Sequence, residues 1–449
     1  MNLPKDFESY FLSRWQAEDV AALLRGLEKE PSVSIRLNTK RMSSDAMPIG
    51  ADGRVPWCQE GFYLKERPSF TADPLLHAGA YYVQEASSMF LAHVLRSIIE
   101  GHFSIFRSAP CDASHLKNFH FSIKNCLDLC AAPGGKSTLL RSLLPDECLL
   151  VSNEPNRARC QVLAENLAKW GHSNVLVTQA YAADLARAVG NGNLPLFSLI
   201  LADVPCSGEG MMRKEAEAIA QWSPAFVTDC AALQRSIIAD IWPALQPGGI
   251  LIYSTCTFNP EEDEENVEWI ARELGADVLS IPIEPAWNIR GDLRKGITSP
   301  LPCYHFLPGQ VRGEGFFLAV LHKHGTPEEL VSGIFDDEKA SLSERKKSKK
   351  KKDRKQQDSP IIILPTNQLD QDGAPQVALS LNDAIRYLQR EALVLPPDTP
   401  RGIVQVCYCG QRLGLMNNLG SRANNLYPKE WRIRSSYVSP ASLFDPPSE

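Results

Sequence analysis

Two cysteines of this chain occupy equivalent positions, because each follows an apolar run that predicts a strand. Cys206 lies in the segment ADVPCSGEG, and Cys256 lies in the segment YSTCTFNPEE. A single cysteine in a protein is most often a small buried hydrophobe. That interpretation is weaker for these two, since each lies in a polar turn at a strand end, where parallel sheets bind their ligands. A thiolate at such a place can act as a nucleophile.

A glycine-containing loop precedes both cysteines and connects a predicted strand to a predicted helix. It reads CAAPGGKST from Cys130 to Thr138, and its small residues allow backbone N–H groups to approach a ligand at a helix N-terminus. A dinucleotide site would require the pattern GxGxxG, which is absent. A P-loop would end as Gly135, Lys136 and Ser137 do, but it would have a glycine where Cys130 stands.

A third class of ligand also suits this loop, namely the S-adenosylmethionine of a doubly wound methyltransferase. Such a site requires an acid at the end of the next strand, which accepts hydrogen bonds from the ribose hydroxyls. Glu154 occupies that place, 24 residues after Cys130. The loop and Glu154 favour this class, although a plain tight turn followed by a helix acid remains an alternative.

The elements that must position these residues alternate between short apolar runs and helical patterns. The predicted strands are 123–130, 149–153, 175–179, 197–203, 249–255 and 315–321. One predicted helix begins at Pro155 and ends at Gly171. A second carries apolar residues at four-residue spacing, namely Leu233, Ile237, Ile241 and Leu245. Strands that alternate with helices predict an α/β fold with a mostly parallel sheet covered on both faces.

Composition limits the class of protein. The chain has 449 residues, of which 44% are hydrophobic and 22% charged, so we expect a globular protein of several domains. No apolar stretch approaches the roughly 18 residues that a membrane-spanning helix needs, and the N-terminus lacks the apolar segment of a secretory signal. Twelve cysteines without a CxxC pair predict reduced thiols in the cytoplasm, without disulfides or a metal site.

One basic run stands out from an otherwise acidic chain. Between Arg345 and Lys355 lie nine Lys or Arg and one Asp, and the rest of the chain has 38 basic and 52 acidic residues. Any nucleic-acid surface outside this run must therefore be a local patch. The run has no apolar residue, so it predicts a flexible linker between a large N-terminal part and a C-terminal segment.

Three segments together carry a resemblance to a known family. LCAAPGGKST, ADVPCSGEGMMRK and YSTCTFNPEEDEENV closely resemble motifs of the Sun/Fmu (NOL–NOP–Sun) family of RNA cytosine carbon-5 methyltransferases. Residues 36–38 and 81–89 resemble two more motifs, and residues 422–434 resemble the C-terminal end of the bacterial methyltransferase F branch. That branch modifies small-subunit (16S) ribosomal RNA.

The resemblance implies a Rossmann-like, S-adenosylmethionine-dependent methyltransferase core with additions at both ends. The expected domains are an N-terminal RNA-binding extension (1–80), the catalytic domain (81–325), a basic flexible linker (326–360) and a small β-rich, PUA-like RNA-binding domain (361–449). The expected partner is small-subunit ribosomal RNA, free or in an assembled subunit. The chain would act as a monomer in the cytoplasm, away from membranes.

The resemblance also implies roles for the catalytic residues. Cys256 would add to carbon 6 of cytosine and so make carbon 5 nucleophilic. Cys206 would assist release of the enzyme, Asp203 would hydrogen-bond the cytosine ring, and Lys136 would hold the cofactor or lower the pKa of a thiol. The expected cofactor-binding residues are Cys130, Ala131, Ala132, Pro133, Gly134, Gly135, Lys136, Glu154 and Asp203.

Two aspects of binding are less well defined by the sequence. Tyr181 stands where many members of the family have an Asp that meets the adenine, and Asp184 is the candidate substitute. A target base inside structured RNA must be swung out, so flanking nucleotides must be held by basic and aromatic residues. The candidates for this role are Arg36, Arg213, Lys214, Tyr427, Lys429, Trp431, Arg432 and Arg434. Both aromatic residues could instead pack inside the C-terminal domain.

Two other functions compete with the methyltransferase. A P-loop NTPase would use Asp203 as its metal acid, but the missing glycine and the cysteine pair count against it. A non-catalytic RNA-binding protein for ribosome assembly would have no need of both cysteines, which are intact.

Overall fold

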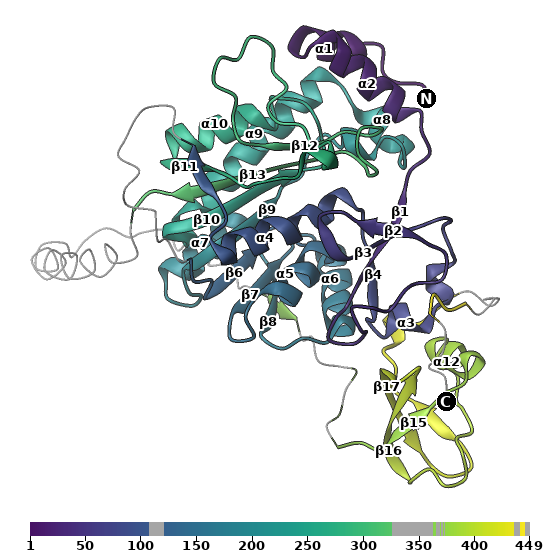
Figure 1. The fold of residues 1–449 in the computed structure, drawn as a ribbon. Coiled ribbons are helices and arrows are strands. Elements are labelled where there is room, and N and C mark those ends of the chain that lie inside the picture. The colour runs from purple at the N-terminus through teal and green to yellow at the C-terminus, as the bar shows by residue number, and fades with distance from the viewer. Residues whose placement is uncertain are drawn as a thin grey trace, which may run out of the picture.

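The computed structural model describes residues 1–106, 121–325, 362–364, 369, 371, 373–434 and 441–444. A ten-stranded sheet forms its centre, in the order β14-β8-β7-β6-β9-β10-β13-β11-β5 with β12 paired to β13 (Figure 1). The strands are β5 (Ser104–Phe106), β6 (Asn125–Asp128), β7 (Leu149–Asn153), β8 (Val175–Gln179), β9 (Phe197–Asp203), β10 (Leu245–Thr255), β11 (Ala276–Ser280), β12 (Tyr304–Phe306), β13 (Phe316–Lys323) and β14 (Ile362–Leu364).

The central strands β6 to β10 are parallel, and the strands outside them are antiparallel to their neighbours. Successive residues of β9 point to opposite faces of the sheet. Leu199 and Leu201 therefore join the core on one face, whereas Ile200 joins the core on the other. The predicted α/β fold with a mostly parallel, doubly covered sheet is confirmed.

Helices cover both faces. α4 (Phe90–Glu100) and α5 (Gly135–Leu143) pack on one face, and α6 (Arg157–Trp170) packs beside α5. α7 (Ala182–Gly190), α9 (Pro224–Ile241) and α10 (Glu264–Glu273) pack on the other. No helix in the described part of the chain is long and apolar enough to cross a membrane.

The two predicted helices form, with differences in detail. α6 is capped by the side chain of Asn156, so it begins two residues after Pro155, and Gly171 ends it with φ +73°. In α9 the predicted apolar face is partly wrong, because Leu233 is 50% exposed. Its neighbour Gln234 is fully buried instead.

An N-terminal layer of two helices and a small sheet covers the catalytic core. α1 (Phe7–Arg14) packs its aromatic rings against Trp222, and α2 (Ala17–Leu27) joins the same apolar cluster, which includes Phe258, through aliphatic side chains. The sheet has the order β2-β3-β1-β4, with β1 (Val33–Leu37), β2 (Ala51–Val55), β3 (Cys58–Leu64) and β4 (Tyr81–Val83). Because β4 pairs with β1, the expected domain boundary at residue 80 falls within this sheet.

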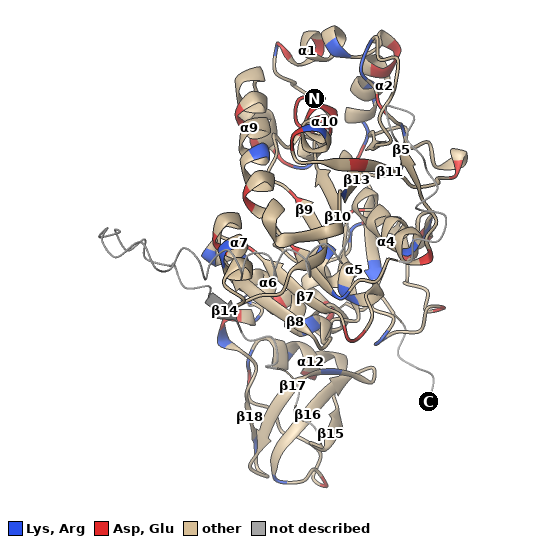
Figure 2. Ribbon diagram, turned by 90° about the vertical axis from the view of Figure 1, so that its left-hand side faces the viewer, with Lys and Arg blue, Asp and Glu red and all other residues tan. Residues whose placement is uncertain are grey.

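The C-terminal domain is a four-stranded sheet with one helix. Its elements are β15 (Gln376–Ala378), α12 (Leu381–Leu388), β16 (Gly402–Tyr408), β17 (Gln411–Asn418) and β18 (Ala423–Asn425). Figure 2 shows it at one end of the molecule, with few charged residues along its strands. Its β-rich character confirms the prediction.

The C-terminal domain docks on the N-terminal layer. One apolar cluster runs from β1 and α3 (Pro74–His77) into α12 and β16. Asp73 Oδ2 accepts a hydrogen bond from Leu443 N at 3.0 Å, and Gln411 Nε2 donates to Arg41 O at 2.6 Å. The predicted linker, 326–360, lies outside the described residues. β14, which follows it, extends the central sheet by pairing with β8.

Candidate active site

The two predicted thiols meet at one edge of the central sheet. β9 and β10 are parallel neighbours, with Asp203 opposite Ser254, so the turns that follow them lie side by side. The Sγ atoms of Cys206 and Cys256 are 3.1 Å apart, and Cys256 N donates to Cys206 Sγ at 3.3 Å. Both side chains remain partly exposed, so a ligand at this edge can reach them.

The surroundings of Cys206 oppose its ionisation. The hydrogen bond with Cys256, followed by burial and by the charge of Cys256, raises the pKa of the Cys206 thiol well above its usual range. Cys206 therefore carries its proton at neutral pH and is able to donate it toward a sulfur beside it.

A lysine and an aspartate flank the thiols. Lys136 Nζ lies 2.8 Å from Asp203 Oδ2, and Ser254 Oγ donates to Asp203 Oδ1 at 2.7 Å. Burial would lower the pKa of Lys136, but the negative charges of Asp203, Cys256 and Asp128 outweigh it and raise that pKa above its ordinary value. The predicted catalytic group of Cys256, Cys206, Asp203 and Lys136 is therefore brought together, with Lys136 as a fixed cation.

The predicted cofactor loop joins β6 to α5, and its two glycines lie in restricted surroundings. Gly134 has φ +115°, a conformation that L side chains rarely adopt. A Cβ at Gly135 would lie only 3.2 Å from the ring of Tyr82. At the start of the loop, burial raises the pKa of Asp128 to about 7. Its Oδ2 accepts from Ser137 Oγ at 2.7 Å, and its buried Oδ1 has no partner.

Glu154 lies beside this loop, at the end of β7. Asn153, the residue before Glu154, connects β7 to the loop. Its carbonyl accepts a hydrogen bond from Ala131 N, and its side-chain Nδ2 donates to Leu129 O. The Glu154 side chain is almost fully buried; its Oε1 accepts from Asn156 N at 3.0 Å, and its Oε2 lies 3.4 Å from Arg159 Nη1. A carboxylate has about four lone-pair sites. Glu154 therefore keeps acceptor capacity for a further donor.

Comparison with known proteins identifies the family. Residues 121–322 match the family model of 16S rRNA methyltransferase RsmB/F, residues 3–86 match the N-terminal domain of 16S rRNA methyltransferase RsmF, and residues 374–433 match the methyltransferase RsmF PUA domain. The chain belongs to the RsmB/F methyltransferase family. This membership favours neither the P-loop NTPase nor the non-catalytic alternative.

Relatives agree with this assignment. The chain is 34% identical over 320 residues to ribosomal RNA small subunit methyltransferase F of Pectobacterium atrosepticum, a match of 68% of this chain and 59% of that one. It is 35% identical over 318 residues to the protein of that name from Klebsiella pneumoniae, with the same coverage. The chain thus spans about three fifths of the length of these curated relatives.

Solved structures share the fold. The methyltransferase homolog protein from Pyrococcus horikoshii is similar with a TM-score of 0.55 and 25% identity, over 71% of this chain and 95% of that one. NSun6 from the same organism, crystallised with SFG, has a TM-score of 0.54 and 20% identity, over 72% of this chain and 99% of that one.

S-adenosylmethionine is the cofactor of the RsmB/F methyltransferases, and the residues of this loop fit it. The two glycines keep the backbone open to a ligand, Glu154 has acceptor sites to spare for ribose hydroxyls, and Asp128 Oδ1 is a buried acceptor without a partner. Tyr181, which stands at the position expected for the adenine contact, is 72% exposed, and the candidate substitute Asp184 is bonded to Arg187 on the same helix.

The RNA contacts predicted for Arg36 and Arg213 are wrong. Arg36 is 2% exposed, donates to Thr138 Oγ1 at 2.6 Å and so ties β1 to α5, while burial lowers its pKa to about 10. Arg213 is bound to Glu314 at 2.7 Å in a buried ion pair. Lys214 pairs with the same carboxylate at 3.3 Å and is partly exposed.

The C-terminal candidates separate into core and surface. Tyr427 is 1% exposed and its ring lies 5.4 Å from that of Tyr387, so it packs the core and does not stack on a base. Trp431 is half-buried against it. Lys429, Arg432 and Arg434 are exposed and line an open cavity of about 320 Å³. Glu430 lines the same cavity, and the three cations are called the basic surface below.

Two buried carboxylates behind the thiols, Glu209 and Glu262, were not predicted from the sequence. Both are fully buried, and both bond the cysteine turns. Glu262 lies in the acidic run PEEDEE, which by composition is typical of a solvated surface. The only signal for Glu209 is its place between Gly208 and Gly210 in the cysteine motif.

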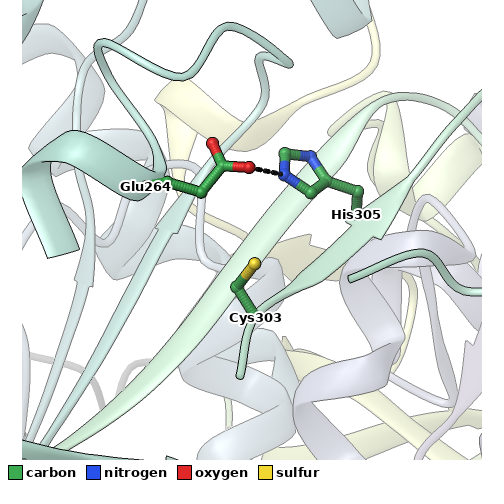
Figure 3. A group of neighbouring side chains, drawn as sticks. All are labelled: Glu264, Cys303 and His305. Carbon is green, nitrogen blue, oxygen red and sulfur yellow. Dashed lines mark hydrogen bonds and ion pairs between the residues drawn. The ribbon is translucent and has the colours of Figure 1, made fainter. Parts of the chain in front are cut away.

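Glu264, Cys303 and His305 form a second buried group (Figure 3). Their possible ligand atoms lie within 4.8 Å of one another. Glu264 Oε1 bonds His305 Nε2 at 2.9 Å, and burial raises the pKa of the Cys303 thiol well above its usual range. Glu264 is the first residue of α10, Cys303 directly precedes β12, and His305 lies within β12.

Proposed function

We propose that this chain is an RNA methyltransferase that uses S-adenosylmethionine to methylate carbon 5 of a cytosine in small-subunit ribosomal RNA. The observation that carries the proposal is the pair of thiols 3.1 Å apart, beside the Lys136–Asp203 pair and at the cofactor edge of the sheet. Two thiols suit a reaction in which one sulfur forms a bond to the substrate and a second group helps to break it.

Each residue has a role that follows from its position. Cys256 Sγ adds to carbon 6 of cytosine, which makes carbon 5 nucleophilic. Asp203, held by Lys136 and Ser254, orients the base through its polar edge. When bound, S-adenosylmethionine supplies an electrophilic methyl group. After carbon 5 has lost its proton to a base, Cys256 leaves, and protonated Cys206 donates a hydrogen bond to the departing sulfur.

The remaining residues bind and orient. The loop 130–136 and Glu154 hold the cofactor, with Glu154 accepting from the ribose hydroxyls. The PUA domain holds RNA through Lys429, Arg432 and Arg434, whose charges attract phosphates. The substrate is the free RNA or the assembled small subunit, and the chain acts as a monomer in the cytoplasm.

Bisulfite mapping tests the proposal. Small-subunit ribosomal RNA from a strain without this gene should lack 5-methylcytosine at one position, and the wild-type chain should restore it. Cys256→Ala should not restore it. Cys230→Ala, which removes a buried thiol of α9 outside both turns, should restore it fully. A full set of methylated cytosines in the deletion strain would overturn the proposal.

A further inference from the structure

Glu209 follows the Cys206 turn in sequence, but it binds the Cys256 turn. It begins the short helix η4 (Glu209–Met211), and its Oε2 accepts hydrogen bonds from Phe258 N at 2.7 Å and Asn259 N at 3.0 Å. Thr257 Oγ1 donates to the same oxygen. Three consecutive residues after Cys256 are thus held by one carboxylate from the other turn.

Glu262 makes the reverse connection. It follows the Cys256 turn in sequence, and its Oε2 accepts from Ser207 N, directly after Cys206, at 3.0 Å. Gln234 Nε2 donates to the same oxygen at 2.7 Å and to Pro205 O at 2.9 Å, on the other side of Cys206. Both residues next to Cys206 are therefore fixed, directly or through Gln234, to the carboxylate of Glu262.

Short contacts close the remaining space between the two turns. Ser207 Oγ and Thr257 Oγ1 are 3.0 Å apart, and Gly210 N donates to Cys256 O at 2.8 Å. Asn259 Nδ2 lies between the two carboxylates and donates to both, at 3.1 Å to Glu209 and 2.7 Å to Glu262. The network is fully buried, so water does not compete for these bonds.

We infer that Glu209 and Glu262 are exchanged positioning residues: Glu209 sets the place of Cys256, and Glu262 sets the place of Cys206. Neither carboxylate bonds a sulfur, and each acts through the backbone of the opposite turn. The inference rests on the proposed function and deepens it, because covalent attack and release need the two sulfurs at separate, defined places. A displacement of about 1 Å at such a site is enough to lower a rate by roughly a hundredfold.

The chemistry of the network explains why both residues are acids. Burial, together with the charge of Glu209, raises the pKa of Glu262 to about 7, so keeping two carboxylates here is unfavourable in itself. A glutamine at position 209 would have one acceptor oxygen and one NH₂ group. In either orientation the NH₂ group would face donors, which are Asn259 Nδ2 and Trp222 Nε1 on one side and the backbone N–H groups on the other. Only a carboxylate accepts on both sides.

The first experiment tests whether the two thiols are held close together, and it does not depend on methyltransferase activity. Diamide removes two electrons and two protons from a pair of close thiols, and peptide mass spectrometry follows formation of the Cys206–Cys256 disulfide in the full chain. Glu209→Gln and Glu262→Gln should each slow this reaction roughly ten- to hundredfold. The matched control is Glu264→Gln, a buried carboxylate that bonds His305 and neither turn, and it should react as the wild type does.

The second experiment looks for exchanged phenotypes in the covalent complex with RNA. Glu262→Gln should accumulate a protein–RNA adduct that survives denaturation, as Cys206→Ala does if Cys206 assists release. Glu209→Gln should form no adduct, as Cys256→Ala does. A purely structural role would change both variants alike. If a glutamine variant does not fold, Glu209→Asp and Glu262→Asp retain the charge but withdraw it by one methylene, and they should give the same pattern.

The outcomes are separable. Wild-type oxidation rates in both variants would overturn the inference, as would identical adduct behaviour in both variants under conditions where Cys206→Ala accumulates an adduct. Slowed oxidation in both variants, with no adduct from any chain including Cys206→Ala, would support the positioning roles and contradict the covalent mechanism.

Discussion

The catalytic edge and the C-terminal domain hold their charged residues in opposite ways. At the catalytic edge, Glu209 and Glu262 are fully buried and bonded on several sides. In the C-terminal domain the core is apolar and aromatic, as at Tyr387 and Tyr427, and the basic residues are exposed. Covalent chemistry requires sulfurs at fixed places, so the edge accepts the unfavourable burial of charge. Attraction to phosphates acts over several ångströms and tolerates mobile side chains.

The largest effects should occur at the two thiols of the catalytic edge. Cys256→Ala should abolish methylation and form no covalent RNA complex, whereas Cys206→Ala should form a complex that persists, because release has lost its proton donor. Denaturing electrophoresis of labelled RNA with each variant measures this. Both substitutions remove the same atoms, so a loss of packing alone predicts equal effects. A persistent complex with Cys256→Ala would reverse the two roles.

The next largest effect is expected at Asp128, a buried carboxylate of the catalytic edge. Its pKa of about 7 in the folded chain lies above the ordinary value of 3.8, so its favourable contribution is complete below pH 4 and is lost as pH rises through 7. Relative to Asp128→Asn, the wild type should lose on the order of 3 kcal/mol of unfolding free energy over this range. Urea denaturation between pH 5 and pH 8 measures the difference.

Asp398→Asn, at an exposed position of the C-terminal domain, is the control for Asp128 and should change the stability little at any pH. Parallel pH dependence in the wild type and Asp128→Asn would show that the buried carboxylate is not the source of the effect.

A smaller loss is expected for the cofactor. Glu154→Ala should leave the ribose hydroxyls without their acceptor and weaken S-adenosylmethionine binding by roughly 1–3 kcal/mol. Titration calorimetry measures this. Glu165→Ala removes a carboxylate of α6 that pairs with Lys169, and it should leave cofactor affinity unchanged. Equal affinity in Glu154→Ala and the wild type would remove Glu154 from the site.

The smallest effect per residue is expected on the basic surface. Replacing Lys429, Arg432 and Arg434 with Ala, one at a time, should weaken RNA binding several-fold each and lower the salt dependence of binding by about one counterion per contact. Cofactor affinity should not change. Arg386→Ala is the control, because its guanidinium is already held by Asp383 and Glu391. An unchanged salt dependence would place the RNA elsewhere.

Much of the fold was predictable because the central strands are buried on both faces. The runs 149–153, 175–179 and 197–203 form β7, β8 and β9 with the predicted limits. An apolar run bounded by turns has few other stable solutions in an alternating α/β pattern. The meeting of Cys206 and Cys256 was predictable for the same reason, since the ends of neighbouring parallel strands lie at one edge.

Residues whose environment comes from distant segments were not predictable. In α9 the period of the apolar residues selects Leu233, but the buried neighbour is Gln234, because Glu262 supplies it with a hydrogen-bond partner. Arginine is a residue type that often contacts RNA, but Arg36 donates its hydrogen bonds to Thr138 and Gln84 inside the protein. In both cases the partner lies 28 or more residues away in the sequence.

The sequence by itself determined that the core is a mostly parallel sheet. It also placed the cofactor loop, Glu154 and the two cysteines at the ends of the strands, because apolar periodicity and turn residues act locally. Only the tertiary structure decided which charges are buried and what they hold. The acidic run that contains Glu262 would be a solvated surface on any exposed helix. Glu262 is buried here because Ser207 N of the other cysteine turn and the side chain of Gln234 offer it hydrogen bonds that replace those of water, and local sequence does not encode that proximity.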